Sequence, residues 1–337
     1  MTQLAVELGD LRGFAQQVGR ASTDMGAGRN YAASNIADAE FGKILELISG
    51  DYADLIPKFH NVLREDSTRL GATRDGLNSV AKSYKEADEA SAGRLATLPG
   101  GGTGTIDDDG VANGFDDRGS GAAELIAPGG EGAALPDLPE VSFGFIFDQV
   151  CNLITELGGP DPREKVTRWL AGDIDKAAMH VSAWRAVADC ADVVKSNLES
   201  GSKAITGTWT GDAANAASAH VGKWTATLTD QSAAMRKLGD HLLTMINEAV
   251  KMAQVVVDII QTLVSLISAA LTNAAIPFYG QWKLIKTVWE GIKMVWAAIK
   301  VIQVFMNALR MVIDTIKMCV GYFSIEKLPP APAAVPA

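Results

Sequence analysis

The stretch TGTWTGDAAN, residues 206–215, separates two long segments with helical periodicity. An ordinary loop needs glycine and polar residues, but it does not need a large aromatic side chain such as Trp209. We interpret the stretch as the turn of a helical hairpin, where Trp209 covers the apolar ends of both helices. Gly211 allows the positive φ of a tight reversal, and Asp212 can cap the second helix. Trp209 has two possible roles, a structural one or an exposed side that docks a partner.

The segment after the turn carries the clearest periodicity in the chain. Its apolar positions follow strict steps of three and four residues, which indicates a coiled-coil or long bundle seam with one polar member, Gln231. The seam runs through Val221, Trp224, Leu228, Gln231, Met235, Leu238, Leu242, Met245, Ala249, Met252, Val256, Ile259, Leu263, Leu266 and Ala270. This predicts a helix over 212–271, about 90 Å long at 1.5 Å per residue. Its predicted partner is a helix from Asp173 to about Ile205.

The first hundred residues show helical spacing of their own. One apolar face runs through Leu70, Thr73, Leu77, Val80, Tyr84 and Ala87, and it continues upstream through Tyr52, Leu55, Phe59 and Val62. An earlier helix is predicted from Leu4, Leu8, Leu11, Ala15 and Val18. We therefore expect an antiparallel helical hairpin whose turn lies between residues 41 and 51.

A segment rich in glycine, proline and aspartate follows this hairpin. Residues 101–140 hold nine acidic residues and one arginine, so they account for −8 of the net charge of −10. Such a segment buries too little apolar surface to offset its conformational entropy, which predicts a flexible acidic linker. Its DDDGVANGFDD portion resembles a calcium loop only weakly, because it lacks flanking helices and an acid at the first ligand position.

These patterns predict an all-α chain of two antiparallel helical hairpins or bundles joined by the acidic linker. The expected divisions are a hairpin at 1–98, a linker at 99–140, a helical-bundle domain at 141–328 with long heptad helices, and a proline-rich tail at 329–337. Within the third division, residues 141–157 read as a short apolar helix, and Asp161-Pro162 has the order of a helix start.

The helix, Trp-x-Gly turn and helix resemble the WXG-100 family, which actinobacteria export through type VII (ESX) secretion systems. The motif residues here are Trp209 and Gly211, and the surrounding segment is similar to the secretion domain of actinobacterial polymorphic toxins. The first hairpin resembles EspC-type substrates of the same systems, on the sequence AKSYKEADEA at 81–90. The resemblance implies a helical hairpin fold and recognition by a type VII secretion ATPase or chaperone.

Within AKSYKEADEA, Tyr84 and Asp88 match the Tyr-x-x-x-Asp/Glu export signal of that family, and they lie one helical turn apart. The first hairpin departs from the family because it has no tryptophan, so the second half could supply the Trp-x-Gly element within the same chain. Tyr322 and Glu326 match the same spacing and are a candidate second signal. The alternative for each pair is a tyrosine at the edge of the core beside a solvated acid.

The last third of the chain repeats tryptophan and lysine every seven residues, as the pairs Trp282–Lys286, Trp289–Lys293 and Trp296–Lys300. Each pair is spaced i, i+4, so lysine can lie beside tryptophan on one helix face. Tryptophan and lysine together suit a bilayer interface. A helix that turns near TNAAIPFYG and packs back along the seam would bury the same residues, and we favour this bundle.

The sequence gives little support to other classes of protein function. The chain has no GxSxG, HExxH or phosphate-binding loop, and its four histidines lie singly, so we expect no enzyme, cofactor or metal site. It has no basic tract for nucleic acid. Three distant cysteines make no disulfide framework. The N-terminus is too charged for a conventional signal peptide, which leaves export by another route.

We therefore expect a non-enzymatic type VII secretion substrate, released to the cell surface or medium, that acts as a secretion and toxin-carrier module. Candidate partners are the secretion ATPase or chaperone, small WxG-family proteins, a second copy of the chain, and a membrane. The alternative function is a secreted pore-forming protein, because the order of hairpin, linker and helical region resembles the N-terminal part of a mycobacterial channel–toxin.

Overall fold

The computed structural model describes residues 5–36, 48–97, 114–129, 174–273 and 279–332. The fold is all-α, as predicted, and the described residues form five long helices. These are α1 (Leu8–Asn35), α2 (Ser49–Ala96), α5 (Ile174–Ile205), α6 (Asp212–Asn273) and α7 (Tyr279–Tyr322). The described residues also form two single turns of 3-10 helix, η2 (Gly121–Glu124) and η4 (Ile325–Lys327). Two short strands are present as well, β1 (Ala5–Val6) and β2 (Trp209–Thr210).

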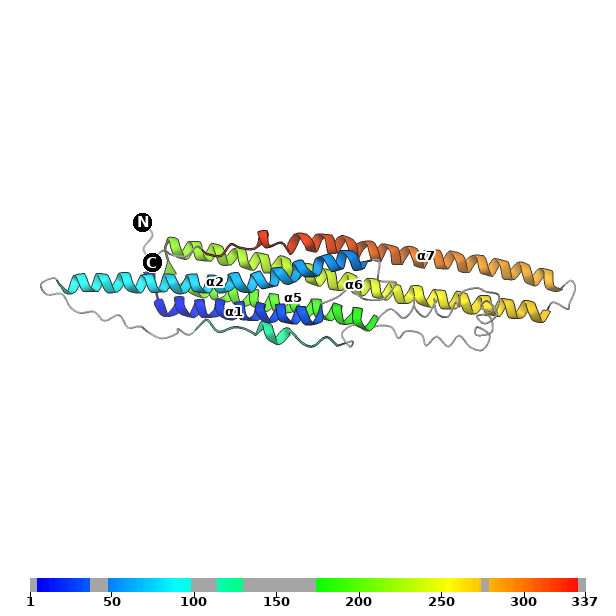
Figure 1. The fold of residues 1–337 in the computed structure, drawn as a ribbon, viewed down its shortest axis with the longest axis horizontal. Helices are drawn as coiled ribbons and strands as arrows, with labels where there is room; N and C mark the ends of the chain where they lie inside the picture. The colour runs from blue at the N-terminus through cyan, green and yellow to red at the C-terminus, as the bar shows by residue number, and fades with distance from the viewer. Residues whose placement is uncertain (1–4, 37–47, 98–113, 130–173, 274–278, 333–337) are drawn as a thin grey trace.

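The helices lie nearly parallel to one long axis, and the molecule is an elongated bundle (Figure 1). Helices α1 and α2 form one antiparallel pair, α5 and α6 form a second, and α7 packs back along α6. Helices α6 and α7 continue side by side past the ends of α1 and α5 (Figure 1). At the opposite end of the bundle the last turns of α2 project beyond the other helices, and residues 86–90 there are exposed.

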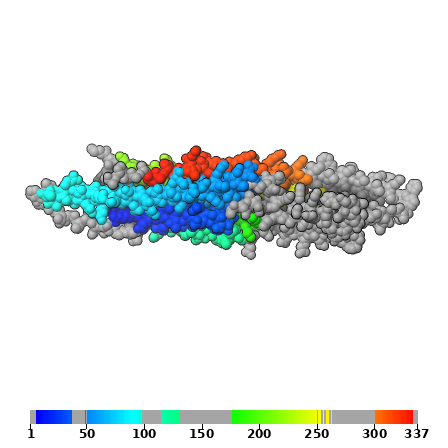
Figure 2. Space-filling model, viewed as in Figure 1, coloured from blue at the N-terminus to red at the C-terminus, as the bar shows by residue number. Residues whose placement is uncertain are grey.

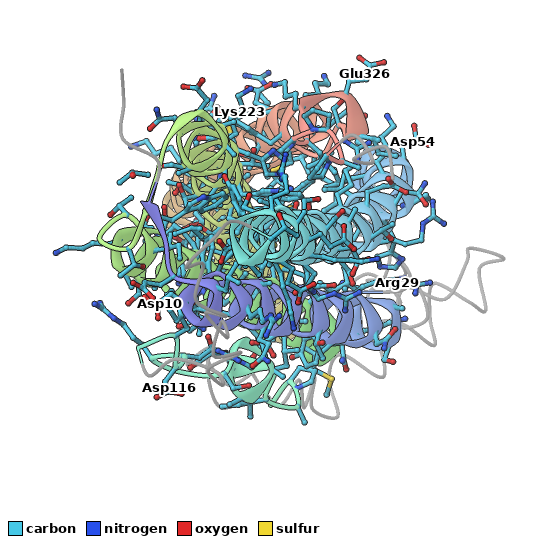
Figure 3. All side chains as sticks on the ribbon, turned by 90° about the vertical axis from the view of Figure 1, so that its left-hand side faces the viewer. Asp10, Arg29, Asp54, Asp116, Lys223 and Glu326 are labelled. Atoms are coloured by element: carbon cyan, nitrogen blue, oxygen red, sulfur yellow. The ribbon has the colours of Figure 1, made fainter. Side chains whose placement is uncertain are left out.

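The seam of α6 is buried from Val221 to Ala249 as its spacing predicted, whereas Met252 and Ile259 are half-buried. Its members from Val221 to Ala249 are each at most 4% exposed, and this includes the polar Gln231. Apart from the buried Asp24 and Asp66, the described Asp, Glu, Lys and Arg side chains are at least partly exposed. Figure 3 shows Asp10, Arg29, Asp54, Asp116, Lys223 and Glu326 around the periphery of the bundle. The distribution follows the cost of burying charge and the gain from removing apolar surface from water.

The two predicted hairpins share one hydrophobic core, and this corrects the expectation of two separate bodies. Tyr52 on α2 links the halves: its hydroxyl accepts a hydrogen bond from Trp184 Nε1 on α5 at 2.6 Å and lies 3.0 Å from Nδ1 of His180. Close approach of α1 and α5 relies on glycine at Gly201, since a methyl group there would lie only 2.8 Å from the Phe14 ring. Sequence spacing predicted each antiparallel helix pair but not that the two pairs pack against each other.

Part of the predicted linker is a packed strap, and the expectation of a flexible segment is wrong for residues 114–129. The Phe115 ring is buried against Phe14 of α1, with ring centroids 6.1 Å apart. Asp117 pairs with Arg20, and Tyr31 donates a hydrogen bond to the Ile126 carbonyl at 2.6 Å. The strap follows the lower edge of the bundle in Figure 2, beside α1. Backbone hydrogen bonds to helix side chains replace the apolar burial that its composition lacks.

The strap also contacts α5. Asn197 accepts a hydrogen bond from the Arg118 backbone N–H at 2.9 Å and donates one to the Gly119 carbonyl at 2.9 Å. Asp24 of α1 accepts from the Gly121 N–H at 2.7 Å. A methyl group at Gly121 would lie 3.0 Å from the Cys190 carbonyl oxygen, so the strap needs glycine at this position.

The start of the predicted proline-rich tail is also packed. Leu328 is 4% exposed, and Arg69 of α2 donates hydrogen bonds to the carbonyls of Leu328 and Pro329 at 3.2 and 3.3 Å. Three predictions lie wholly or mostly outside the described residues: the first hairpin's turn, expected between 41 and 51, the short helix at 141–157, and the helix start at Asp161-Pro162.

Candidate functional site

The Trp-x-Gly turn is a tight reversal between α5 and α6. Helix α5 ends at Ile205, the predicted residue, and Thr208 N–H donates to its carbonyl at 3.1 Å. Gly211 has a φ of 111°, a conformation that glycine adopts without strain. Helix α6 begins at Asp212, and Asn215 N–H donates to the Gly211 carbonyl at 3.0 Å. Asp212 therefore lies in the first helical turn rather than at the predicted cap, where a carboxylate still favours the helix dipole.

The chain's N-terminal residues hold this turn from outside. Strand β1 pairs antiparallel with β2, so that Val6 lies opposite Trp209 and Ala5 opposite Thr210. Glu7 N–H extends the ladder to the Thr208 carbonyl at 3.1 Å. The sequence predicted helix from Leu4 onward, but α1 begins at Leu8, because residues 5 and 6 pair with the turn instead. The pairing of β1 with β2 therefore joins the two halves of the sequence at the Trp-x-Gly turn.

Trp209 is 3% exposed, so it has no exposed side of the kind that a docking surface needs, and the structural interpretation of the ring holds. Its indole nitrogen donates a 3.4 Å hydrogen bond to the Tyr84 hydroxyl of α2. Tyr84 and Trp209, each from one of the two motifs, are therefore neighbours although they lie 125 positions apart in sequence. Asp88 lies one turn beyond Tyr84 on α2 and is exposed.

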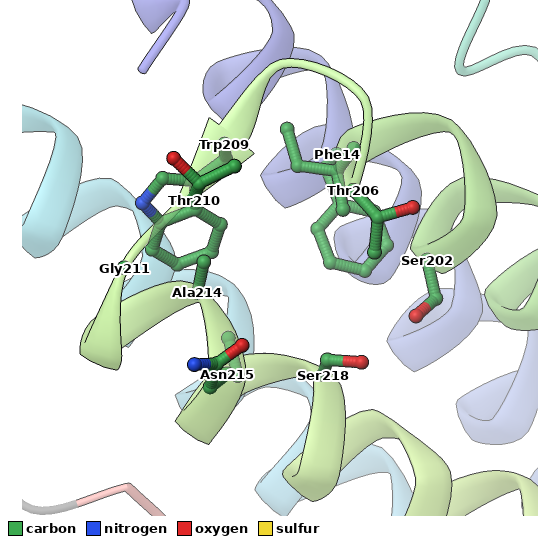
Figure 4. Close-up of a pocket in the computed structure, with 11 residues that line it drawn as sticks. Phe14, Ser202, Thr206, Trp209, Thr210, Gly211, Ala214, Asn215 and Ser218 are labelled. Carbon is green, nitrogen blue, oxygen red and sulfur yellow. The ribbon is translucent and has the colours of Figure 1, made fainter. Parts of the chain in front are cut away.

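Two cavities flank the Trp209 ring. The first, of about 240 Å³, lies between α5, α6 and Phe14 of α1. Figure 4 shows Phe14, Trp209 and Thr206 around it, with Ser202 on the α5 side and Asn215 and Ser218 on the α6 side. The second, of about 280 Å³, lies between α2 and α6. The first offers hydroxyl and amide groups, whereas the second is mainly apolar.

Two further side-chain contacts join α2 and α6, at increasing distance from the Trp-x-Gly turn along α6. Thr73 Oγ1 lies 3.0 Å from His220 Nε2, which also accepts a 3.1 Å hydrogen bond from Trp224 Nε1. Burial, with a smaller effect of Lys223, lowers the pKa of His220. An indole N–H can only donate, so His220 accepts through Nε2 and is held neutral.

The second of these contacts between α2 and α6 involves a carboxyl group that is enclosed in the core. Asp66 is 0% exposed, and its Oδ1 atom accepts a 3.3 Å hydrogen bond from Gln231 Nε2. Burial raises the pKa of Asp66 to about 8, although Gln231 and Arg69 act in the opposite direction. Asp66 Oδ2 and Gln231 Oε1 have no hydrogen-bond partner. A protonated Asp66 could donate one hydrogen bond where a carboxylate can only accept.

The candidate second signal has a different geometry. Helix α7 ends at Tyr322, and Glu326 lies beyond it in η4, so the two residues do not share a helical face. Tyr322 is half-buried, and the Lys327 ammonium lies 5.2 Å from the centroid of its ring. Glu326 is exposed.

The tryptophan–lysine repeat lies on α7, and of its residues only Lys300 has a described side chain, which is exposed. Trp282, Lys286, Trp289, Lys293 and Trp296 lie in α7 with side chains outside the description. Among the described residues no helix has the length and apolar character needed to cross a bilayer. Further along α7, Ile302, Val304, Met306 and Met311 are between 37% and 48% exposed.

The described part of the chain contains no group of three or more His, Cys, Asp or Glu side chains that could hold a metal ion. Its two cysteines, Cys190 and Cys319, are free and buried, and burial raises the pKa of each thiol to about 12. Such thiols do not ionise near neutral pH and are poor nucleophiles.

No family model, curated protein or solved structure matches this chain. Sequence reasoning identified Tyr84, Asp88, Trp209 and Gly211 but missed two features of their surroundings. It missed β1, because a two-residue strand has no periodicity, and it missed Asp66, because a single aspartate on a helix is most often solvated.

Proposed function

We propose that this chain is a non-enzymatic substrate of a type VII secretion system and that its export determinant is composite. Tyr84 and Asp88 on α2 form one part, and the Trp209–Gly211 turn forms the other. The observation that carries the proposal is the 3.4 Å hydrogen bond from Trp209 Nε1 to the Tyr84 hydroxyl. Two motifs that the family resemblance singles out, from opposite halves of the chain, thus meet at one site.

Each part has a distinct physical role in this proposal. Trp209 is buried, so it acts by fixing the position of Tyr84 rather than by contacting a partner directly. Tyr84 is half-buried, and Asp88 lies among the exposed residues 86–90 of α2. A secretion ATPase or chaperone can reach this part of α2 without opening the core. The protein is then delivered to the cell surface or medium, where the bundle serves as carrier and partner-binding module.

The test is export of point variants from a strain with a working type VII system. Tyr84→Ala and Asp88→Ala should leave a folded helical protein that accumulates in the cell, because Tyr84 lies at the edge of the core and Asp88 is exposed. The ratio of protein in culture filtrate to protein in the cell pellet is measured. Glu86→Ala is the matched control, since Glu86 is an exposed acid on the same helix and pairs only with Lys82 in the described contacts. Normal export of both test variants would contradict the proposal.

Exposed apolar side chains favour a second candidate function, a membrane-active protein that forms pores. Ile302 and Met306 lie one turn apart on α7 and are 48% and 37% exposed. Dye leakage from anionic vesicles is the measurement. Ile302→Lys with Met306→Lys should abolish leakage, whereas Gln303→Lys with Asn307→Lys, at exposed polar positions, should not. Absence of leakage by the parent protein at every pH would eliminate this candidate.

A further inference from the structure

Strand β1 lies at the level of Tyr84 along the bundle. Helices α1 and α2 are antiparallel, and Ser22 and Ser67 fix their register, because each hydroxyl donates to the other residue's carbonyl, at 2.7 and 2.8 Å. Both helices advance about 1.5 Å per residue, so equal numbers of residues counted from this contact stay level. Glu7, the N-cap of α1, is therefore level with about position 82 of α2, within one turn of Tyr84.

From this level β1 reaches across to the Trp-x-Gly turn. The turn is secured at its ends by hydrogen bonds to the adjoining helices, and its middle is held by β1. Glu7 N–H donates to the Thr208 carbonyl at 3.1 Å, and Val6 lies directly opposite Trp209. Directly opposite residues of an antiparallel pair carry their side chains on the same face. Val6 is half-buried against the core, so β1 supports both the backbone of the turn and the face that carries the indole ring.

The contact between Trp209 and Tyr84 is sensitive to the position of this turn. The distance from the indole nitrogen to the hydroxyl is 3.4 Å, and at about 3.6 Å such a contact is no longer a hydrogen bond. A displacement of a few tenths of an ångström therefore breaks it. The chain offers a second connection between the same two residues, from Trp209 through β1 to α1, which packs along α2.

We propose that β1 is a third part of the export determinant, a positioning element that holds the Trp-x-Gly turn where Trp209 reaches Tyr84. The inference rests on the proposed export function, in which Tyr84 and Asp88 are the residues that the secretion machinery contacts. Strand β1 acts through Trp209 and needs no contact of its own with that machinery. Release of β1 leaves both motifs in the sequence but lets them move apart in space.

Glu7→Pro and Glu7→Ala form a matched pair of variants that tests the proposal. Both remove the same exposed side chain, but only proline removes the backbone N–H that donates to Thr208. Glu7 has a φ of −96° and follows an extended residue, so proline fits this position with little strain. In a strain with a working type VII system, export of Glu7→Pro should fall to the level of Tyr84→Ala. Glu7→Ala should be exported like the parent protein.

Hydrogen exchange of the Trp209 indole N–H gives a readout that does not depend on export. Its resonance is assigned in NMR spectra of the purified full chain by comparison with Trp209→Phe. Glu7→Pro should accelerate this exchange by about threefold to tenfold, the equilibrium effect of one net hydrogen bond. Glu7→Ala should leave it unchanged. Urea midpoints of both variants report whether the bundle as a whole stays folded.

A disulfide tests the same pairing without proline. Ala5 and Thr210 lie directly opposite each other in β1 and β2, at a separation that suits a disulfide. Ala5→Cys is combined with Thr210→Cys in a Cys151→Ser background, which leaves the two buried cysteines in place. The oxidised protein should exchange the Trp209 indole N–H more slowly than the same protein after reduction. Equal rates would overturn the proposal, and this comparison decides it if Glu7→Pro proves to be unfolded.

The export results separate a failure of this inference from a failure of the proposed function. Normal export of Glu7→Pro together with retention of Tyr84→Ala would remove β1 from the determinant and leave the proposed function intact. Equal loss of export for Glu7→Ala and Glu7→Pro would assign the effect to the side chain and also overturn the inference. Normal export of Tyr84→Ala would overturn the proposed function and the export role of β1 with it, and the exchange rates would then decide whether β1 positions Trp209.

Discussion

Trp209 Nε1 donates a hydrogen bond to the hydroxyl of Tyr84 at 3.4 Å, and this contact ties the turn of one helical hairpin to the second helix of the other. Tyr84→Phe should lower the free energy of unfolding by about 1 kcal/mol, because it removes one long hydrogen bond and keeps the ring. Trp209→Ala should lower it by about 3–5 kcal/mol, because it leaves a large cavity. Urea denaturation followed by circular dichroism measures both values.

Tyr322→Phe is the control for this pair, since Tyr322 is a half-buried tyrosine at the end of another helix. It should change the unfolding free energy by less than about 0.5 kcal/mol. A loss for Tyr84→Phe as large as that for Trp209→Ala would show that the hydroxyl does more than pair with the indole. Fully stable Trp209→Ala would contradict the buried, structural role of the ring.

The strap at residues 114–129 should resist proteolysis in the folded protein. Arg118 is the one trypsin site within 101–140, and Asn197 holds the backbone on both sides of its scissile bond. We expect slow cleavage after Arg118 and faster cleavage after Arg94, which lies exposed near the end of α2. Asn197→Ala should accelerate cleavage at Arg118 and leave the rate at Arg94 unchanged, as measured by mass spectrometry of timed digests.

Ser196→Ala provides the neighbouring control, since its hydroxyl bonds back to the Asp192 carbonyl of its own helix at 2.9 Å. Cleavage after Arg118 in the parent protein at the rate of an unstructured peptide would show that the strap is not held in solution.

Stability should depend on pH through Asp66. Burial raises its folded-state pKa to about 8, above the unfolded value of 3.8. The folded protein therefore keeps a proton that the unfolded chain releases, so the contribution to stability is complete below pH 4 and is lost as the pH rises towards 8. Within this window the loss is about 1 kcal/mol per pH unit. Asp66→Asn, whose amide can both donate to and accept from Gln231, should abolish this dependence.

Denaturation midpoints between pH 4.5 and 8.5 measure the effect as the difference between parent and variant. Subtracting the two curves removes the opposite contribution of His220, whose lowered pKa reduces stability as the pH falls below 6.5. Asp54→Asn is the control, because Asp54 is an exposed aspartate on the same helix. Parallel curves for the parent and Asp66→Asn would mean that Asp66 does not titrate in this range.

The sequence determined the helices and their inward faces. Steps of three and four residues predicted the buried seam from Val221 to Ala249, because a side chain's place on a helix follows from its position alone. The end of α5 at Ile205 and the positive φ of Gly211 were also predictable, since both depend on local turn chemistry. The i, i+4 spacing that places Tyr84 and Asp88 one turn apart is likewise a local property of one helix.

Only the tertiary structure decided which of these faces meet. Nothing in the spacing placed Tyr84 beside Trp209, paired Asp66 with Gln231, or laid residues 114–129 across α1 and α5. Such contacts depend on the relative register of whole helices, which is set by the summed packing of many side chains. A segment that buries little apolar surface, such as the strap, becomes ordered only when neighbouring helices present the hydrogen-bond partners that its backbone needs.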